Sequence, residues 1–145
     1  MQPTRINDRL SVSKQPEPAE FSELARQGFK AVINNRPDGE DAAQPGSAAE
    51  QQAAEQAGMG YAHIPVSLNA ITEGDVRRFQ SALLAAPGPV FAHCKSGTRS
   101  LSLWTIGEVL DGRMRRSDVI SFGQAHGYDL KAADAWLARH EAGAR

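Results

Sequence analysis

The residue with the clearest chemical potential is Cys94, in the run Val-Phe-Ala-His-Cys-Lys-Ser-Gly-Thr-Arg-Ser that spans residues 90–100. It is the only cysteine of the 145-residue chain, so it has no partner for an intrachain disulfide. A lone cysteine is most often a small buried hydrophobic residue. A thiolate, however, is a strong nucleophile, and arginines and helix N-termini stabilise thiolates. Both features follow Cys94 within a few residues, and they favour a reactive nucleophile.

The segment Lys95-Ser96-Gly97-Thr98 predicts a cradle for an anion. Its residues are small or polar around a glycine, so the backbone can curl before a helix begins. Such a loop points several N–H groups at one spot, where the helix dipole adds partial positive charge. The planar guanidinium of Arg99 can hold two oxygens of a phosphate at once. Ser100 is expected to hydrogen-bond the sulfur and help it leave in a second step.

The surrounding elements predict a sheet that delivers this loop. Apolar runs at 29–34, 61–66 and 90–93 are typical of buried strands, and residues 4–13 of a short hairpin. Strands that alternate with helices indicate a mostly parallel sheet, whose carboxyl edge is where ligands bind. We therefore predict one α/β domain over residues 1–145, with four to five strands. Helices are expected at 18–28, 47–58, 72–86, 101–110, 117–125 and 130–142.

Two helix starts carry the capping-box pattern, in which a serine or threonine precedes an acid by three residues. Ser47 with Glu50 is one pair, and Thr72 with Asp75 is the other. In both pairs the acid is expected to serve the helix N-terminus.

The His-Cys pair, the Ser-Gly loop and the following Arg-Ser resemble the cysteine-dependent phosphatases of the protein-tyrosine and dual-specificity type. More narrowly, the chain resembles the bacterial beta-lactamase-hydrolase-like phosphatase family. That likeness includes Val32-Ile-Asn-Asn-Arg-Pro-Asp-Gly-Glu40 and Gly60-Tyr-Ala-His-Ile-Pro-Val66. The resemblance implies a metal-independent hydrolase of phosphate monoesters, phosphotyrosine among them, that passes through a thiophosphate intermediate. Cys94 would be the nucleophile, Arg99 the phosphate clamp, and His93 a hydrogen-bonding support of the loop.

One spacing departs from the broad superfamily, which places five residues between the cysteine and the arginine. Here four residues separate Cys94 from Arg99. That shorter spacing fits the narrower bacterial family, but the loop also resembles that of rhodanese-type sulfurtransferases, which carry a persulfide on the cysteine. A non-catalytic oxyanion-binding module is a third reading. His93 and the long helical segment after the loop favour the phosphatase.

The general acid that should protonate the leaving oxygen has several candidates. In the dual-specificity relatives an aspartate follows the strand equivalent to 61–66, but here the sequence reads Ser-Leu-Asn-Ala-Ile-Thr. Asp38 is the preferred candidate, because its loop lies at the predicted carboxyl edge of the sheet. Arg36 in the same loop is a candidate second anion contact, or else a salt-bridge partner within the loop. The alternative acids are Glu40, Asp41 and Asp75.

The composition narrows the classes of partner. The formal net charge is −1, and a general nucleic-acid or membrane-surface binder usually needs a basic excess. No stretch approaches the ~20 apolar residues of a membrane span, and residues 1–18 lack a signal-peptide core. His63, His126 and His140 stand at no metal-ligand spacing. We expect a cytoplasmic protein without metal or cofactor that acts on a phosphorylated protein or small molecule.

Overall fold

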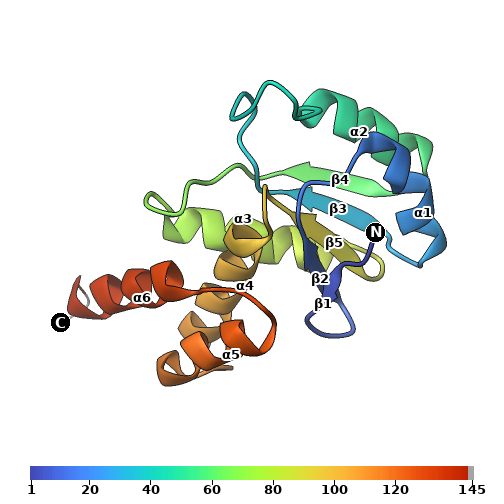
Figure 1. The fold of residues 1–145 in the computed structure, drawn as a ribbon. Coiled ribbons are helices and arrows are strands. Elements are labelled where there is room, and N and C mark those ends of the chain that lie inside the picture. The colour runs from blue at the N-terminus through green and yellow to red at the C-terminus, as the bar shows by residue number, and fades with distance from the viewer. Residues whose placement is uncertain (144–145) are drawn as a thin grey trace.

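The computed structural model describes residues 1–143, and a five-stranded sheet lies at its centre (Figure 1). The strand order is β1-β2-β5-β3-β4. β1 pairs antiparallel with β2, and all other neighbours are parallel. The predicted hairpin and the mostly parallel sheet are therefore confirmed. The strands are β1 (Thr4–Arg5), β2 (Leu10–Ser13), β3 (Ala31–Asn34), β4 (Gly60–His63) and β5 (Val90–His93).

Helices cover both faces of the sheet, as a parallel sheet requires. Figure 1 shows α1 and α2 on one face and α3 to α6 on the other. The helices are α1 (Phe21–Arg26), α2 (Ser47–Gln56), α3 (Glu73–Ala85), α4 (Thr98–Leu110), α5 (Val119–Ala125) and α6 (Lys131–Gly143), with short 3₁₀ turns η1 (Pro18–Glu20) and η2 (Arg116–Asp118). Within residues 1–143, none of these helices has the length and apolar character needed to cross a membrane.

The core has two halves because successive residues of a strand point to opposite faces. Val32 and Phe91 belong to the half that includes Phe21 and Leu24 of α1. Ile33, by contrast, belongs to the half built from α3, α4 and α6. Burial on both faces explains why the two central strands, β3 and β5, read as continuous apolar runs.

Some element boundaries differ from the sequence-based prediction. The helix expected from residue 101 begins at Thr98, because Gly97 adopts a φ of 107° and lets the chain turn straight into α4. The strand expected over 61–66 ends at His63. Beyond it, the N–H groups of Ile64 and Val66 donate to the carbonyls of Asn34 and Asn35, outside the strand ladder.

The two capping predictions have opposite outcomes. Thr72 and Asp75 form a capping box at the start of α3, as predicted. The prediction for Ser47 and Glu50 is wrong. The N-cap of α2 is Gly46, which has no side chain, so Ser47 and Glu50 do not form a capping box. Glu50 instead points inward, and its side chain is only 1% exposed.

Candidate active site

Cys94 lies at the carboxyl end of the central strand β5, directly before α4. It is 1% exposed, and its Sγ accepts a hydrogen bond from the backbone N–H of Gly97 at 3.0 Å. Gly97 has a positive φ, and a Cβ there would lie 2.6 Å from the hydroxyl of Tyr128. Both conditions favour glycine at this position. The sulfur therefore faces a backbone donor at a helix N-terminus, an environment that stabilises a thiolate.

The other residues of the loop, Lys95, Ser96 and Thr98, contact neighbouring segments and one another. The side chains of Lys95 and Ser96 are exposed, whereas Thr98 is half-buried. The carbonyl of Lys95 accepts the N–H of Gln15 at 3.1 Å, which ties the loop to the segment after β2. The hydroxyls of Ser96 and Thr98 lie 3.2 Å apart. These contacts hold the curled backbone that the sequence predicted.

Arg99 belongs to the first turn of α4, and its guanidinium binds a carboxylate. Its Nη1 donates to Glu40 Oε2 at 2.6 Å, and its Nη2 donates to Glu40 Oε1 at 2.9 Å. A further bond runs to the carbonyl of Val66 at 3.0 Å. The pKa of Arg99 is raised, chiefly by its hydrogen bond to Glu40. Both terminal nitrogens of the Arg99 guanidinium are thus engaged by the carboxylate of Glu40.

Glu40 also binds Arg36, the predicted second anion contact. Arg36 is buried, and it donates from Nε to Glu40 Oε1 at 2.9 Å and from Nη1 to Gln15 Oε1 at 3.0 Å. The hydrogen bonds from Arg99 and Arg36 lower the pKa of Glu40 from 4.5 to about 2. The salt bridge that the sequence left open as the alternative role of Arg36 is therefore present.

This carboxylate gives a first testable prediction, on stability. Because folding lowers the pKa of Glu40, its contribution is complete above about pH 4.5 and is lost as the pH falls toward 2. The side chain is 30% exposed, so we expect Glu40→Gln to cost about 1 kcal/mol or less. Urea unfolding of parent and variant should therefore differ most at about pH 6, less at about pH 3, and converge only as the pH approaches about 2. Glu55→Gln, an exposed glutamate in α2, is the control. An equal difference at both pH values would contradict the prediction.

Ser100 takes a different contact from the one expected. Its hydroxyl is buried and donates to Asn35 Oδ1 at 2.7 Å. The amide of Asn35 in turn donates to the carbonyl of Ile64 at 2.9 Å. Ser100 therefore braces α4 against the loops that follow β3 and β4, and this observed bond is not to the sulfur.

Asp38, the preferred acid, binds the start of α2. Its Oδ1 accepts the N–H of Ser47 at 2.8 Å, and its Oδ2 accepts the Ser47 hydroxyl at 2.6 Å. The side-chain and then the backbone hydrogen bond of Ser47 lower the pKa of Asp38. A general acid must instead hold a proton at the working pH. The contacts of Asp38 thus favour a helix-capping role.

A pair of substitutions separates the two roles of Asp38. From its contacts we expect Asp38→Ala to lower the free energy of unfolding by roughly 1 kcal/mol, the usual cost of a lost cap. We expect Asp38→Asn to change kcat for an aryl phosphate by less than about threefold, whereas loss of a general acid typically costs 100-fold or more. Urea unfolding and steady-state rates measure both effects. A 100-fold fall in kcat for Asp38→Asn would establish the acid role.

The other candidate acids also have identified partners. Asp41 accepts the N–H of Ala43 at 2.9 Å. Asp75 accepts the N–H of Thr72 at 2.9 Å and also binds Arg78. Both aspartates therefore hold local turns, and which group acts as the acid stays a prediction.

His93 contacts the backbone of the loop, and its ring also contacts Glu50, a partner that the sequence did not predict. Its Nδ1 lies 3.1 Å from the carbonyl oxygen of Cys94, and its Nε2 lies 2.7 Å from Glu50 Oε1. Glu50 Oε2 accepts a hydrogen bond of 2.6 Å from Gln15. Glu50 went unrecognised because its spacing from Ser47 matches a capping box, and nothing else in the sequence distinguishes it.

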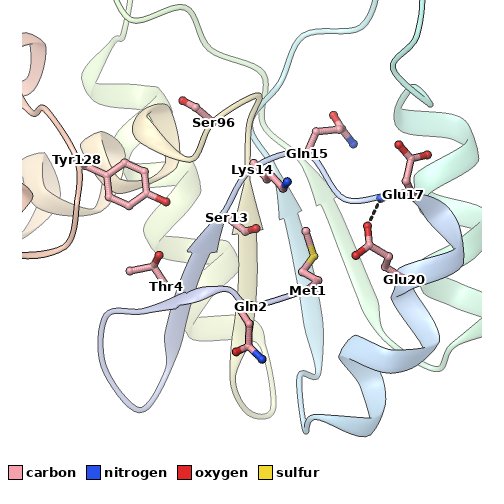
Figure 2. A pocket seen from close by; sticks show the side chains of 10 residues that line it. All are labelled: Met1, Gln2, Thr4, Ser13, Lys14, Gln15, Glu17, Glu20, Ser96 and Tyr128. Atoms are coloured by element: carbon pink, nitrogen blue, oxygen red, sulfur yellow. Dashed lines mark hydrogen bonds between the residues drawn. The ribbon is translucent and has the colours of Figure 1, made fainter.

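A polar cavity of about 570 Å³ lies beside the Cys94 loop (Figure 2). Ser96 and Tyr128 stand at one end of it, and Glu17 and Glu20 stand at the other. Neither Cys94 nor Arg99 lines it, so it is a neighbour of the candidate site and not the site itself. In residues 1–143, no three His, Cys, Asp or Glu side chains are grouped so that they could hold a metal ion. The lining residues are Met1, Gln2, Thr4, Ser13, Lys14, Gln15, Glu17, Glu20, Ser96 and Tyr128.

Known proteins share this sequence and this fold. Residues 4–111 match the family described as "Beta-lactamase hydrolase-like protein, phosphatase-like domain". A beta-lactamase hydrolase-like protein of Agrobacterium fabrum is 55% identical over 98% of this chain and 33% of its own length. One from Xylella fastidiosa is 51% identical over 92% of this chain and 31% of its own length. The chain thus spans about a third of these curated relatives.

Solved structures of other proteins share the fold of this chain. A candidate phosphatase from Neisseria meningitidis superposes with a TM-score of 0.84 at 35% identity, over 94% of this chain and 96% of its own. TpbA from P. aeruginosa (TM-score 0.69, 21% identity) and Tk-PTP (0.71, 18%) share the fold. Fold and sequence together define a phosphatase-like α/β domain with a protein-tyrosine-phosphatase-like fold. Within that class, the chain belongs to the beta-lactamase hydrolase-like phosphatase domain family.

Proposed function

We propose that this domain is a metal-independent cysteine phosphatase that hydrolyses phosphate monoesters. The observation that carries the proposal is the position of the Cys94 sulfur, 3.0 Å from the Gly97 nitrogen at the N-terminus of α4, the helix whose first turn holds Arg99. Backbone donors and a guanidinium are the groups that stabilise charge on a transferring phosphoryl group. The beta-lactamase hydrolase-like family and the candidate phosphatase from Neisseria meningitidis support the same class of reaction.

The proposed reaction has two displacements at phosphorus. The Cys94 thiolate attacks the phosphorus, an S–P bond forms, and the bond from phosphorus to the leaving oxygen breaks. The leaving oxygen takes a proton from an acid or from water. A water molecule then attacks the phosphocysteine and loses a proton, the S–P bond breaks, and inorganic phosphate leaves with the thiolate restored. The loop N–H groups and Arg99 hold the phosphoryl oxygens in both steps.

For the substrate we propose a phosphorylated protein or small molecule, with aryl esters such as phosphotyrosine first. A phenolate is a good leaving group, so an aryl ester depends least on a strong general acid. The acid candidates here are all engaged in local hydrogen bonds or salt bridges. TpbA, which shares the fold, was crystallised with phosphotyrosine. A free cysteine such as Cys94 stays reduced in a reducing compartment, and we therefore place the reaction in the cytoplasm.

A second candidate, sulfur transfer, is favoured by the short loop. Four residues separate Cys94 from Arg99, and α4 already begins at Thr98. This loop gives a tetrahedral phosphate less room than a longer one. In that reaction the thiolate would attack the outer sulfur of thiosulfate and release sulfite. Cyanide would then take the sulfur from the Cys94 persulfide as thiocyanate, restoring the thiolate.

One experiment distinguishes these activities. The parent protein is assayed with an aryl phosphate in the presence of EDTA, and the same preparation with thiosulfate and cyanide. We expect phenolate release that EDTA does not affect. Thiocyanate without phosphate chemistry would establish the sulfurtransferase. Silence in both assays, with phosphate still raising the thermal midpoint, would leave a non-catalytic oxyanion-binding module.

A further inference from the structure

Glu50 is a buried carboxylate that the proposed reaction does not use directly. It lies within α2, and its side chain is 1% exposed. Burial of a carboxylate costs several kcal/mol unless hydrogen bonds compensate for the lost water. Here three groups face it: His93 Nε2 at 2.7 Å, Gln15 Nε2 at 2.6 Å and the Tyr61 hydroxyl at 3.5 Å. The buried Glu50 side chain thus contacts His93, the residue that directly precedes Cys94.

The imidazole of His93 connects Glu50 to the backbone of Cys94. Its Nδ1 lies 3.1 Å from the Cys94 carbonyl oxygen. A carbonyl oxygen can only accept a hydrogen bond, so this contact requires a hydrogen on Nδ1. A carboxylate oxygen likewise only accepts, so Nε2–H donates to Glu50 Oε1, and this second hydrogen bond fixes the rotation of the imidazole ring. Glu50 is in the position to do this.

The direction of the Cys94 carbonyl matters for the anion cradle. In a trans peptide the C=O of one residue and the N–H of the next point in opposite directions. The described residues contain no cis peptide bond. When His93 holds the Cys94 carbonyl, the N–H of Lys95 therefore points away from His93.

We propose that Glu50 is a positioning residue for the chemistry of Cys94. It holds His93 so that Nδ1–H donates to the Cys94 carbonyl, and this fixes the first peptide of the loop. The inference rests on the proposed function, because it takes Cys94 as the reacting group. It adds a residue on a distant helix to the site.

The test compares Glu50→Gln with Glu55→Gln, the same substitution at an exposed position of α2. Glutamine keeps the shape and one acceptor oxygen but removes the charge. We expect Glu50→Gln to lower kcat for an aryl phosphate by roughly 10- to 100-fold, as lost outer hydrogen-bond partners do at other sites. KM should change less than about threefold, because the phosphate contacts remain. Iodoacetamide should also alkylate Cys94, the single cysteine, more slowly. Unchanged kcat and alkylation in a folded variant would overturn the inference.

A double-mutant cycle with His93→Asn excludes a general structural effect. The asparagine amide can replace the Nδ1 donor, but it does not reach Glu50. If Glu50 acts through His93, adding Glu50→Gln to His93→Asn should cost less than about twofold in kcat and in the alkylation rate. A full, additive cost in that background would show that Glu50 acts independently of His93.

Two measurements keep this inference separable from the proposed function and from misfolding. Alkylation of Cys94 does not depend on phosphatase activity. If the parent protein does not hydrolyse aryl phosphates, the proposed function is refuted, but the alkylation rates of the variants still test the role of Glu50. Should Glu50→Gln fail to fold, ¹⁵N NMR of the His93 ring in the parent protein decides. A hydrogen on Nδ1 supports the inference, and a hydrogen on Nε2 alone overturns it.

Discussion

Cys94→Ser should reduce aryl phosphate turnover by roughly 10⁴- to 10⁶-fold, the range seen when other enzymes lose their nucleophile. A serine hydroxyl is a weak nucleophile unless a neighbouring base takes its proton. The Cys94 side chain contacts the Gly97 N–H, which is a donor and cannot act as a base. Initial rates with EDTA present, for parent and variant, measure the effect. After rapid acid quench, only the parent should carry a phosphoryl group on residue 94.

The same variant should keep its affinity for the anion. The Gly97 N–H still finds an acceptor in the serine oxygen, and Arg99 is untouched. Inorganic phosphate should therefore raise the thermal midpoint of Cys94→Ser about as much as that of the parent. Equal thermal midpoints without phosphate serve as the control for folding. Hydrolysis by Cys94→Ser at the parent rate would refute the role of Cys94.

Arg99→Ala should lower kcat/KM for an aryl phosphate by roughly 10³-fold or more, the effect of removing an arginine that stabilises a transferring phosphoryl group. Arg99→Lys should recover little of this loss. Lysine keeps the charge but lacks the planar pair of donors, which now binds both oxygens of Glu40. Steady-state kinetics of the two variants beside the parent measure both effects.

The control for Arg99 must account for Glu40, which would lose one of its two arginine partners. Arg99→Ala combined with Glu40→Gln removes that unpaired carboxylate, and we expect the double variant to stay as inactive as Arg99→Ala. Arg115→Ala, at an exposed arginine in the turn after α4, should behave as the parent. An Arg99→Lys variant within twofold of the parent would show that a point charge suffices and that the clamp reading is wrong.

The sequence determined the fold class and the position of the candidate nucleophile. Local patterns suffice for both, because burial on both faces makes β3 and β5 continuous apolar runs and Thr72 with Asp75 carries its own capping signal. Cys94 could be placed at the end of a strand for the same reason. All residues of the loop from Cys94 to Ser100 are close in sequence, so their spacing alone indicates an anion cradle.

Only the tertiary structure decided which side chains surround that loop. Glu50 has the spacing of a capping residue, yet it lies 2.7 Å from His93, which is 43 positions away in the chain. Glu40 binds Arg99 across 59 positions, and Ser100 donates to Asn35 across 65. A carboxylate or an amide has the same local signal whether it caps a turn or meets a buried partner. The partner of each of these side chains is determined when α2 and the loop after β3 pack against β5, and no short-range sequence pattern predicts that packing.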